Sequence, residues 1–455
     1  MKIKPFRFKH QGSSLTLVLR EELQLPAKGC YLITGKSGLG KSTFLQLLKG
    51  FYPEFLSGEL EGDLEFFSNS HYLFQNPFSQ IIHPKALSEF LFSMENKIFS
   101  REKMQEKMLL MESFRLENMA LKETSQLSHG ECQRLLLSSL VASEPDWLFL
   151  DEPTAFIDQS MRQYIYEQLG NSKKEIGILI IDHHLDEVES ICDGFFELVL
   201  LPNESNGADQ LVEIRFQLNN NIPKPEVQKN DNDQFSWQLS SKKHSSNLIV
   251  KGLTFGYQKD NVLFSDVGFT LNAGEVVTLI GPSGVGKSTI LKLLLFELKK
   301  QLGEISWQIA GGKIPAKRIF DYVALLFQNP ENHFLFDTVE EELNQFYQTD
   351  KKELVEKLLE KFKLKHLLFQ SPYLLSEGQK RRLSLIITLL LDRPFLLLDE
   401  PSFGQDQEQV YVIQQFIRDL KKQGVAVLMV SHDPSFYHEI SDRIITLARR
   451  VEDGE

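Results

Sequence analysis

The sequence has few cysteines, no excess of basic residues and no long hydrophobic run. Its 455 residues include only three cysteines, Cys30, Cys132 and Cys192. So few and widely spaced thiols support neither a disulfide framework nor a zinc cluster, so we expect core residues in a reducing cytoplasm. Lysine and arginine number 50 against 62 acidic residues, giving a formal net charge of −12. This balance argues against a protein that coats nucleic acid.

No segment has the pattern of a membrane span or a secretory signal. The most apolar run, Leu383–Leu391, is interrupted by Ser384 and followed by Asp392 and Arg393, so it falls short of the roughly 20 apolar residues that a membrane helix needs. The first 14 residues lack the apolar core of a signal peptide. We therefore expect a cytoplasmic protein that works at a membrane only through a partner.

Five short motifs occur twice and in the same order. They are GKSGLGKST and GPSGVGKST, LFQNP twice, LSHGECQR and LSEGQKRR, LFLDEPT and LLLDEPS, and IIDHH and VSHD. The two copies of each motif are separated by 246 to 253 positions, so the chain consists of two diverged copies of one domain. The sequence predicts domain 1 at residues 1–218, a polar linker at 219–246 and domain 2 at 247–455.

The region between the copies, residues 202–247, is rich in asparagine, serine and lysine, which is typical of a solvated linker. Within it, LVEIRFQL (Leu211–Leu218) alternates apolar and polar residues and predicts a strand at the edge of domain 1.

Each copy has the pattern of an α/β domain. Short runs such as CYLIT, WLFL, VVTLI and VAVLMV are apolar throughout, which indicates strands buried on both faces of a mostly parallel sheet. TFLQLLK and TILKLLLFELKK predict helices after the glycine loops. KKELVEKLLEKFKLKHLL, residues 351–368, has helical spacing and predicts a separate helical lobe.

The pattern G-x-x-x-x-G-K-[ST] occurs once in each copy, between an apolar strand and a helix, which is where a phosphate-binding loop is credible. The glycines let backbone N–H groups converge, and the helix N-terminus adds its positive end. Lys41 and Lys287 would reach the β- and γ-phosphates, and Thr43 and Thr289 would lie nearer the α-phosphate. The predicted loop residues are Gly35, Lys36, Ser37, Gly38, Leu39, Gly40, Lys41, Ser42 and Thr43, and Gly281, Pro282, Ser283, Gly284, Val285, Gly286, Lys287, Ser288 and Thr289.

Carboxylates follow a second apolar strand in each copy. Asp151 and Asp399 would hold Mg²⁺ together with the hydroxyls of Ser42 and Ser288. Glu152 and Glu400 come next and could polarise the water that attacks a γ-phosphate. An Asp-Glu pair alone would indicate only a solvated loop; the upstream phosphate loop favours catalysis.

Three further motifs indicate function less specifically: the helix starts LSHGE and LSEGQ, the histidines after apolar strands, and DHHLDE. Ser128 and Ser376 are predicted N-caps, and Gly130 and Gly378 would allow close approach of a γ-phosphate to each helix end. His183 and His432 follow apolar strands and could sense that phosphate. DHHLDE could instead bind a metal, but the second copy keeps only Ser-His-Asp, which favours the phosphate sensor.

Two predictions concern single side chains. Gln75 and Gln328 could contact Mg²⁺ or water from a mobile loop. Tyr257 could stack on adenine, and Phe8 is the candidate in the first copy, with a plain core phenylalanine as the alternative.

This ordered set resembles the ATP-binding cassette (ABC) ATPases over nearly the whole chain. In their terms the motifs are Walker A, Q-loop (residues 74–77 and 327–330), signature, Walker B, D-loop (153–158 and 401–406) and switch histidine. The resemblance implies two P-loop NTPase domains, each with a mostly parallel sheet core, a helical lobe and a small antiparallel β-subdomain. It also implies ATP and Mg²⁺ as cofactors, and two composite sites in a pseudo-symmetric internal pair.

The first composite site would join Lys41, Ser42, Gln75, Asp151, Glu152 and His183 to Ser376 and Gly378. The second would join Lys287, Ser288, Gln328, Asp399, Glu400 and His432 to Ser128 and Gly130. Both sites are predicted to hydrolyse ATP. His129 and Glu131 depart from the signature pattern, and Glu131 would bring a carboxylate near phosphate.

FQNPENHFLFDTVEEEL (Phe327–Leu343) and PSFGQD (Pro401–Asp406) are similar to the ATPases of energy-coupling-factor importers and their cobalt or nickel relatives. That resemblance implies the motor of an importer of a vitamin, vitamin precursor or metal ion, bound through its Q-loops to membrane scaffold and substrate-binding subunits. The alternatives are a soluble tandem cassette protein that acts on ribosomes, a DNA-repair ATPase and a tandem sugar-importer ATPase. The Asn/Ser-rich linker with Pro223 and Pro225 disfavours the first, and the lack of heptads and paired cysteines disfavours the second.

Overall fold

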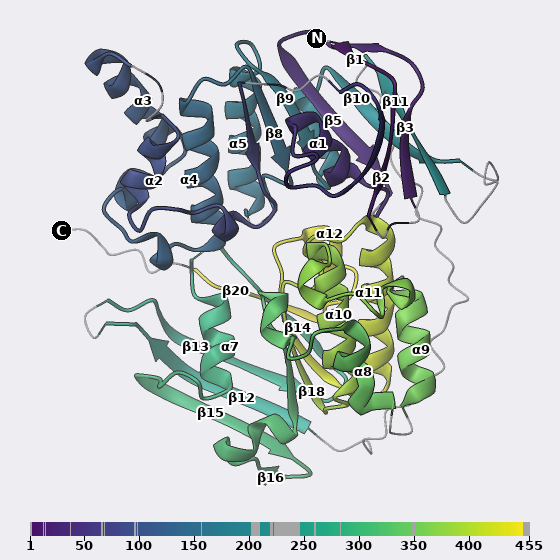
Figure 1. Cartoon of the computed structure of the whole chain (residues 1–455). Coiled ribbons are helices and arrows are strands. Elements are labelled where there is room, and N and C mark those ends of the chain that lie inside the picture. Colours follow the sequence, from purple (N-terminus) through teal and green to yellow (C-terminus); the bar gives the residue numbers. More distant parts are fainter. Residues whose placement is uncertain are drawn as a thin grey trace. The chain divides into compact units, whose positions relative to one another are not determined.

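The computed structural model shows a chain with two compact units, Met1–Glu226 and Val227–Glu455, coloured purple to teal and teal to yellow in Figure 1. The structure describes residues 2–448 apart from positions 12, 14, 37, 65, 66, 68, 95, 96, 98, 156, 202–209, 219–221, 223–245, 259, 260, 283 and 348–350. Nearly all of the predicted linker and the predicted loop residues Ser37 and Ser283 therefore lie outside the described residues.

Unit 1 is built on one nine-stranded sheet in the order β6-β2-β3-β11-β10-β5-β9-β8-β7. Its strands are β6 (Gly58–Gly62), β2 (Phe6–His10), β3 (Leu15–Leu19), β11 (Gln210–Gln217), β10 (Gly194–Leu200), β5 (Gly29–Gly35), β9 (Gly177–Ile181), β8 (Trp147–Asp151) and β7 (Ser70–Leu73). The five strands from β10 to β7 are parallel. Two of them, β5 and β8, contain the apolar runs CYLIT and WLFL, which predicted a mostly parallel sheet. A separate pair joins β1 (Lys2–Ile3) to β4 (Leu23–Gln24).

The strand predicted from LVEIRFQL is confirmed as β11, but its predicted place at an edge is wrong. β11 pairs antiparallel with β10 and parallel with β3, so it joins the parallel core to the antiparallel strands β3, β2 and β6. Its alternating pattern arises because the side chains of Val212 and Ile214 are buried whereas Arg215 faces solvent.

Unit 2 repeats the parallel core, in the order β17-β18-β19-β14-β20. These strands are β17 (Val323–Leu326), β18 (Phe395–Asp399), β19 (Ala426–Val430), β14 (Val276–Ile280) and β20 (Arg443–Thr446). Its antiparallel part is a second sheet formed by β13 (Phe264–Asn272), β12 (Ser246–Phe255), β15 (Leu302–Ile309) and β16 (Gly312–Lys313). The predicted fold class is therefore confirmed.

Helices follow the motifs in both units. α1 (Lys41–Lys49) and α7 (Lys287–Leu294) begin at the two loop lysines; the second is shorter than TILKLLLFELKK predicted. α4 (His129–Ala142) and α10 (Glu377–Leu390) follow the signatures, and α5 (Gln159–Ser172) and α11 (Gln407–Lys422) follow the D-loops. The helical lobes contain α2 (Ala86–Phe92) and α3 (Arg101–Ser113), and α8 (Val339–Tyr347) and α9 (Lys352–Lys361).

Short helices complete the units. These are α6 (Leu185–Val188), α12 (Pro434–Tyr437) and the 3₁₀ turns η1 (Pro77–Ser79), η2 (Glu117–Met119), η3 (Thr124–Gln126), η4 (Glu189–Ile191), η5 (Ala316–Asp321), η6 (Pro330–His333), η7 (Lys365–Leu367) and η8 (Pro372–Leu374). Among the described residues, none of the helices combines the length and apolarity that crossing a bilayer requires.

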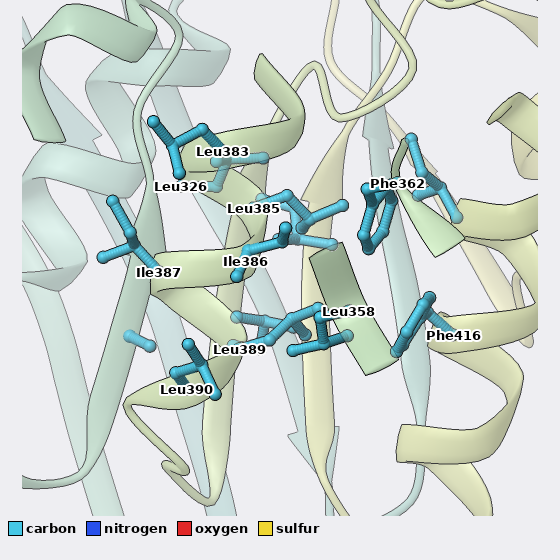
Figure 2. Close-up of a cluster of buried hydrophobic side chains, with 14 of the residues drawn as sticks. Leu326, Leu358, Phe362, Leu383, Leu385, Ile386, Ile387, Leu389, Leu390 and Phe416 are labelled. Carbon is cyan, nitrogen blue, oxygen red and sulfur yellow. The ribbon is translucent and has the colours of Figure 1, made fainter. Parts of the chain in front are cut away.

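The parallel strands are apolar throughout because each face of the sheet packs on a different layer. In β18 of unit 2, Leu396 and Leu398 belong to the core under α8–α11, and Leu397 belongs to the core under α7 and the antiparallel sheet. Figure 1 shows these layers on opposite sides of β14 and β18. Figure 2 shows the helical core, in which α10 supplies a series of leucines and isoleucines.

Both units share unusual backbone positions. Arg115 and Lys363, Glu144 and Asp392, and Glu152 and Glu400 all have φ between 50° and 55°, and each pair is 248 positions apart. Residues with side chains rarely adopt this region. Its recurrence at equivalent positions shows that the two copies have kept one backbone.

We predict that Phe362→Ala lowers the free energy of unfolding of unit 2 by about 3 kcal/mol, because it leaves a cavity in the helical core. Phe362 is fully buried and stacks on Phe416 with 5.2 Å between ring centroids. Urea titration followed by circular dichroism measures the change. Phe369, in the same lobe, is 81% exposed, so Phe369→Ala is the control and should shift stability by less than about 0.5 kcal/mol. Equal losses would contradict the layer assignment.

Candidate nucleotide sites

Each glycine loop connects the end of a parallel strand to the first turn of a helix. The glycine before each lysine, Gly40 or Gly286, has φ near 91° or 104° and is the N-cap of α1 or α7. A Cβ at Gly286 would lie 2.8 Å from the side chains of Leu263 and Phe264. Neither helix has a side-chain N-cap hydrogen bond in the described residues, so their first N–H groups can serve an anion.

The loop lysines fold back over their own loops. Lys41 Nζ donates to the carbonyl oxygens of Gly35 at 2.9 Å and Lys36 at 3.2 Å. Lys287 Nζ donates to Gly281 at 2.8 Å and Pro282 at 3.0 Å. These bonds fix an ammonium group over the loop, where it adds positive charge to that of the helix end.

The Walker B aspartates are buried at the ends of their strands. Asp151 and Asp399 are each 5% exposed. Burial, and then the charge of the following glutamate, raises the pKa of each to about 6, although hydrogen bonds from Ser42 and Ser288 oppose the shift. The serines and aspartates predicted to hold the metal thus come together in each unit.

These residues fit a magnesium ion. Asp399 Oδ1 is buried, and no described residue donates a hydrogen bond to it. A buried carboxylate oxygen without a partner is costly, and Mg²⁺ binds carboxylate, hydroxyl and phosphate oxygens. In unit 1, Tyr72 Oη donates to Asp151 Oδ2 at 3.0 Å. Sequence reasoning missed Tyr72, because one polar atom in an apolar strand gives no motif.

In unit 1, three predicted residues meet at one carboxylate. Glu152 Oε1 lies 2.9 Å from His183 Nε2, and Glu152 Oε2 accepts a hydrogen bond from Gln75 Nε2 at 2.7 Å. Burial opposes ionisation of both Glu152 and His183. Their mutual attraction outweighs it, so the pKa of Glu152 is lowered and that of His183 is raised.

Unit 2 arranges the same residues differently. The backbone N–H of His432 donates to Glu400 Oε2 at 3.2 Å, and His432 Nε2 lies 3.4 Å from Glu400 Oε1. Burial raises the pKa of Glu400 to about 7, and Lys287 opposes the shift. Within the described residues the Gln328 side chain donates no hydrogen bond to Glu400.

Both glutamates depend on a strained backbone. Glu152 and Glu400 have φ of 50° and 55°, and their N–H groups donate to Ile181 O at 2.9 Å and Val430 O at 3.0 Å on the neighbouring strand. His183 and His432 follow the ends of those same strands. The strain therefore turns each carboxylate toward the histidine of its own unit, and such outliers are typical of functional sites.

The predicted N-caps of the signature helices are confirmed. Ser128 and Ser376 each form a capping box, with Glu131 in α4 and Gln379 in α10. Glu131 Oε2 accepts from Ser128 N at 2.8 Å, which explains its departure from the signature pattern as a helix cap. A Cβ at Gly378 would lie 2.6 Å from Gly404 O, so close packing against the D-loop requires this glycine.

The metal alternative for DHHLDE finds no geometric support. Within the described part of the chain, no three histidine, cysteine or acidic side chains gather as ligands. His183 instead contacts Glu152, and Asp182 accepts hydrogen bonds from Thr154 and Tyr166.

The two side chains predicted to stack on adenine, Tyr257 and Phe8, differ in their exposure to solvent. Tyr257 is 67% exposed, and its hydroxyl lies 3.1 Å from Thr289 Oγ1 of the phosphate loop. Phe8 as an adenine contact is wrong: it is 1% exposed and packs edge-on against Tyr52.

Strand register identifies the residue of unit 1 that is equivalent to Tyr257. Phe8 pairs with Leu17 as Phe255 pairs with Phe264, so His10 occupies the place of Tyr257. The side chain of His10 is exposed. The sequence alone could have found it only with this register known.

We predict that Tyr257→Ala weakens binding of a fluorescent ATP analogue roughly tenfold, as loss of aromatic stacking on a base costs about 1–3 kcal/mol. His10→Ala should weaken the other site, and the double variant should weaken both. Equilibrium titration measures each affinity. Tyr373→Ala, at an exposed tyrosine of the helical lobe, is the control; unchanged affinity in Tyr257→Ala would refute the assignment.

Relatives match nearly the whole chain. This chain is 31% identical over 463 residues to a Bacillus subtilis protein with the provisional name HMP/thiamine import ATP-binding protein YkoD. The match covers 92% of this chain and 84% of the relative. This chain is also 28% identical to the provisionally named ABC transporter ATP-binding protein CPE1583 of Clostridium perfringens, covering 93% and 84%.

Among solved structures, the archaeal ribosome recycling factor aABCE1, in complex with ribosomal stalk protein aP1, matches with a TM-score of 0.64 at 21% identity. The match covers 96% of this chain and 86% of that chain. At this identity the likeness shows the fold alone.

The family model for ABC transporters matches residues 20–155 and 264–403, once in each unit and over more than half of the chain. With the doubled Walker, Q-loop and signature geometry, this match shows that the chain is a tandem ATPase of the ABC transporter family.

Proposed function

We propose that this chain is the motor subunit of an energy-coupling-factor-type importer of a vitamin, vitamin precursor or metal ion. It would act at the inner face of the membrane through partner subunits. The observation that carries the proposal is the exposed apolar surface beside the Q-loop of unit 2, on a chain whose relatives have transporter names. The name of the Bacillus subtilis relative, HMP/thiamine import, supports the vitamin-precursor class.

The roles of the site residues follow from their chemistry. Lys41 and Lys287, with the first N–H groups of α1 and α7, would bind the phosphates. Mg²⁺, held by the serine and aspartate of each unit, would neutralise phosphate charge. Glu152 and Glu400 would orient the attacking water, and His183 and His432 would contact the γ-phosphate.

Each site would be completed by the signature of the other unit. Lys41, Glu152 and His183 would share a nucleotide with Ser376 and Gly378, and Lys287, Glu400 and His432 with Ser128 and Gly130. Support comes from the dipoles of α4 and α10, which place partial positive charge at the helix ends beside Ser128 and Ser376. Each signature has one carboxylate in the first turn of its helix, Glu131 in unit 1 and Glu377 in unit 2, so the two differ in where that charge lies.

The apolar surface consists of Leu335, Phe336, Phe369 and Leu374. Their exposed fractions are 83%, 46%, 81% and 82%. Two backbone hydrogen bonds hold their segments together, from Val339 N and Glu340 N to carbonyl oxygens of residues 370 and 368. Exposed apolar groups gathered in this way indicate a protein-binding surface.

A buried carboxylate shapes this surface. Glu342 is 2% exposed and accepts hydrogen bonds from the N–H groups of both Leu335 and Phe336. Glu89 binds the N–H groups of Ile82 and His83 in unit 1 in the same way. The two loops thus have one backbone support, but unit 2 displays leucine and phenylalanine where unit 1 has isoleucine and histidine. We therefore assign the stronger membrane contact, to an apolar helix of a scaffold subunit, to unit 2.

Affinity purification of the tagged chain from detergent-solubilised native membranes, with mass spectrometry, tests the function. A polytopic scaffold and a small substrate-binding membrane protein are expected. Recovery of ribosomal proteins without membrane subunits would overturn the importer and leave the ATPase standing.

We predict that Leu335→Asp combined with Leu374→Asp abolishes recovery of the membrane subunits, because two carboxylates cannot be buried against an apolar helix. ATP binding should persist. Leu302→Asp, at a 65% exposed leucine of the antiparallel sheet, is the matched control and should retain the partners. Undiminished recovery in the double variant would count against this surface.

We also predict that Glu400→Gln retains ATP but lowers turnover at least about 100-fold, because an amide cannot accept the water's proton. Glu152→Gln should cause a loss of different size, since Glu152 also holds Gln75 and His183. Steady-state ATPase rates and retention of radiolabelled ATP measure both effects. Glu353→Gln, on the exposed face of α9, is the control; normal turnover in Glu400→Gln or equal losses in both variants would contradict these expectations.

A further inference from the structure

Arg381 lies in the second turn of the signature helix α10 and contacts three segments of unit 2. Its guanidinium donates from Nη1 to Phe327 O and from Nη2 to Gln328 O, the latter at 2.6 Å, both in the Q-loop. Nη1 also lies 3.4 Å from Asp399 O, at the end of the Walker B strand. The guanidinium carbon lies 5.8 Å from the ring centroid of Phe403 in the D-loop.

These contacts are made at an energetic cost. Arg381 is 1% exposed, and within the described residues no carboxylate forms an ion pair with it. Burial lowers its pKa to about 10, although Asp399 and Glu400 oppose the shift. A buried charge without an ion pair is expensive, so packing alone does not account for an arginine here.

Unit 1 shows that the fold accepts a neutral side chain at this position. Gln133 replaces Arg381, and its Nε2 donates to Glu152 O at 2.8 Å. Phe74 and Gln75 are the Q-loop counterparts of Phe327 and Gln328. Ala155 occupies the place of Phe403. Unit 2 therefore has both the arginine and the aromatic ring, and unit 1 has neither.

Each unit therefore links its Q-loop to its Walker B end by a different route. In unit 1 the Gln75 side chain reaches the Glu152 carboxylate directly. In unit 2 the link passes through the Arg381 guanidinium, which is planar and can bind two carbonyl groups at once.

We propose that Arg381 is a positioning residue that ties the Q-loop of unit 2 to Asp399 and Glu400, so that turnover by Glu400 depends on it. Gln75 has the corresponding role in unit 1. The inference concerns ATP hydrolysis and does not depend on which membrane partner the chain binds, so a failed search for partners would leave it testable.

The test compares Arg381→Gln and Arg381→Lys in the full chain by steady-state ATPase kinetics. Arg381→Gln should lower kcat roughly tenfold, as misplacing reacting groups does, and should change the KM for ATP by less than about threefold. Lysine keeps the charge but cannot bind two carbonyl groups with a planar guanidinium. Arg381→Lys should therefore restore less than half of the decrease in log kcat that Arg381→Gln causes. Full recovery by lysine, or an unchanged kcat in folded Arg381→Gln, would overturn the proposal.

Hydrogen–deuterium exchange separates positioning from loss of stability. Arg381→Gln should accelerate exchange in the peptide that contains residues 327–330 and leave residues 74–77 unchanged. Arg382→Gln is the matched control, because Arg382 is the adjacent arginine and is also buried, at 6% exposure; it should not accelerate exchange at 327–330. Equal acceleration by both variants, or throughout unit 2, would show a structural role alone and refute the proposal.

Discussion

Two adjacent carboxylates buried at the end of one strand are the constraint on which each unit depends. Asp151 with Glu152, and Asp399 with Glu400, repel one another where water cannot screen them. Each unit therefore surrounds its pair with compensating groups: a loop lysine, a serine hydroxyl and a histidine from the next strand. The parallel sheet makes this possible, because the carboxyl ends of its strands meet at one edge.

The two copies compensate for these charges in different ways. Unit 1 uses neutral donors, since Tyr72 binds Asp151 and Gln75 binds Glu152. Unit 2 has a buried arginine nearby, and among its described residues none donates a hydrogen bond to Asp399 Oδ1. The two units share one backbone, including its residues with positive φ, but they surround their buried carboxylates with different side chains.

Much of the fold could be predicted from the sequence, because its signals are local. Continuous apolar runs predicted the buried strands, and Ser128 and Ser376 predicted the helix caps. What failed depended on pairing partners. The strand β11 alternates like an edge strand, yet it lies inside the sheet because β3 covers its second edge. Phe8 and His10 lie two residues apart on one face of β2, and only the structure shows that Phe8 is covered whereas His10 is exposed. Arg381 and Tyr72 were missed because their partners are backbone or carboxylate oxygens brought together from distant segments.

The strand β11 has a mechanical consequence. In unit 1, β11 connects the antiparallel strands to the parallel core through backbone hydrogen bonds on both of its edges. A rotation of the antiparallel strands is therefore transmitted to the parallel strands. In the described part of unit 2 no strand pairing joins the antiparallel sheet to the parallel core, and the two sheets share a side-chain core. Unit 1 therefore has a continuous backbone hydrogen-bond connection between its antiparallel and parallel strands that the described part of unit 2 lacks.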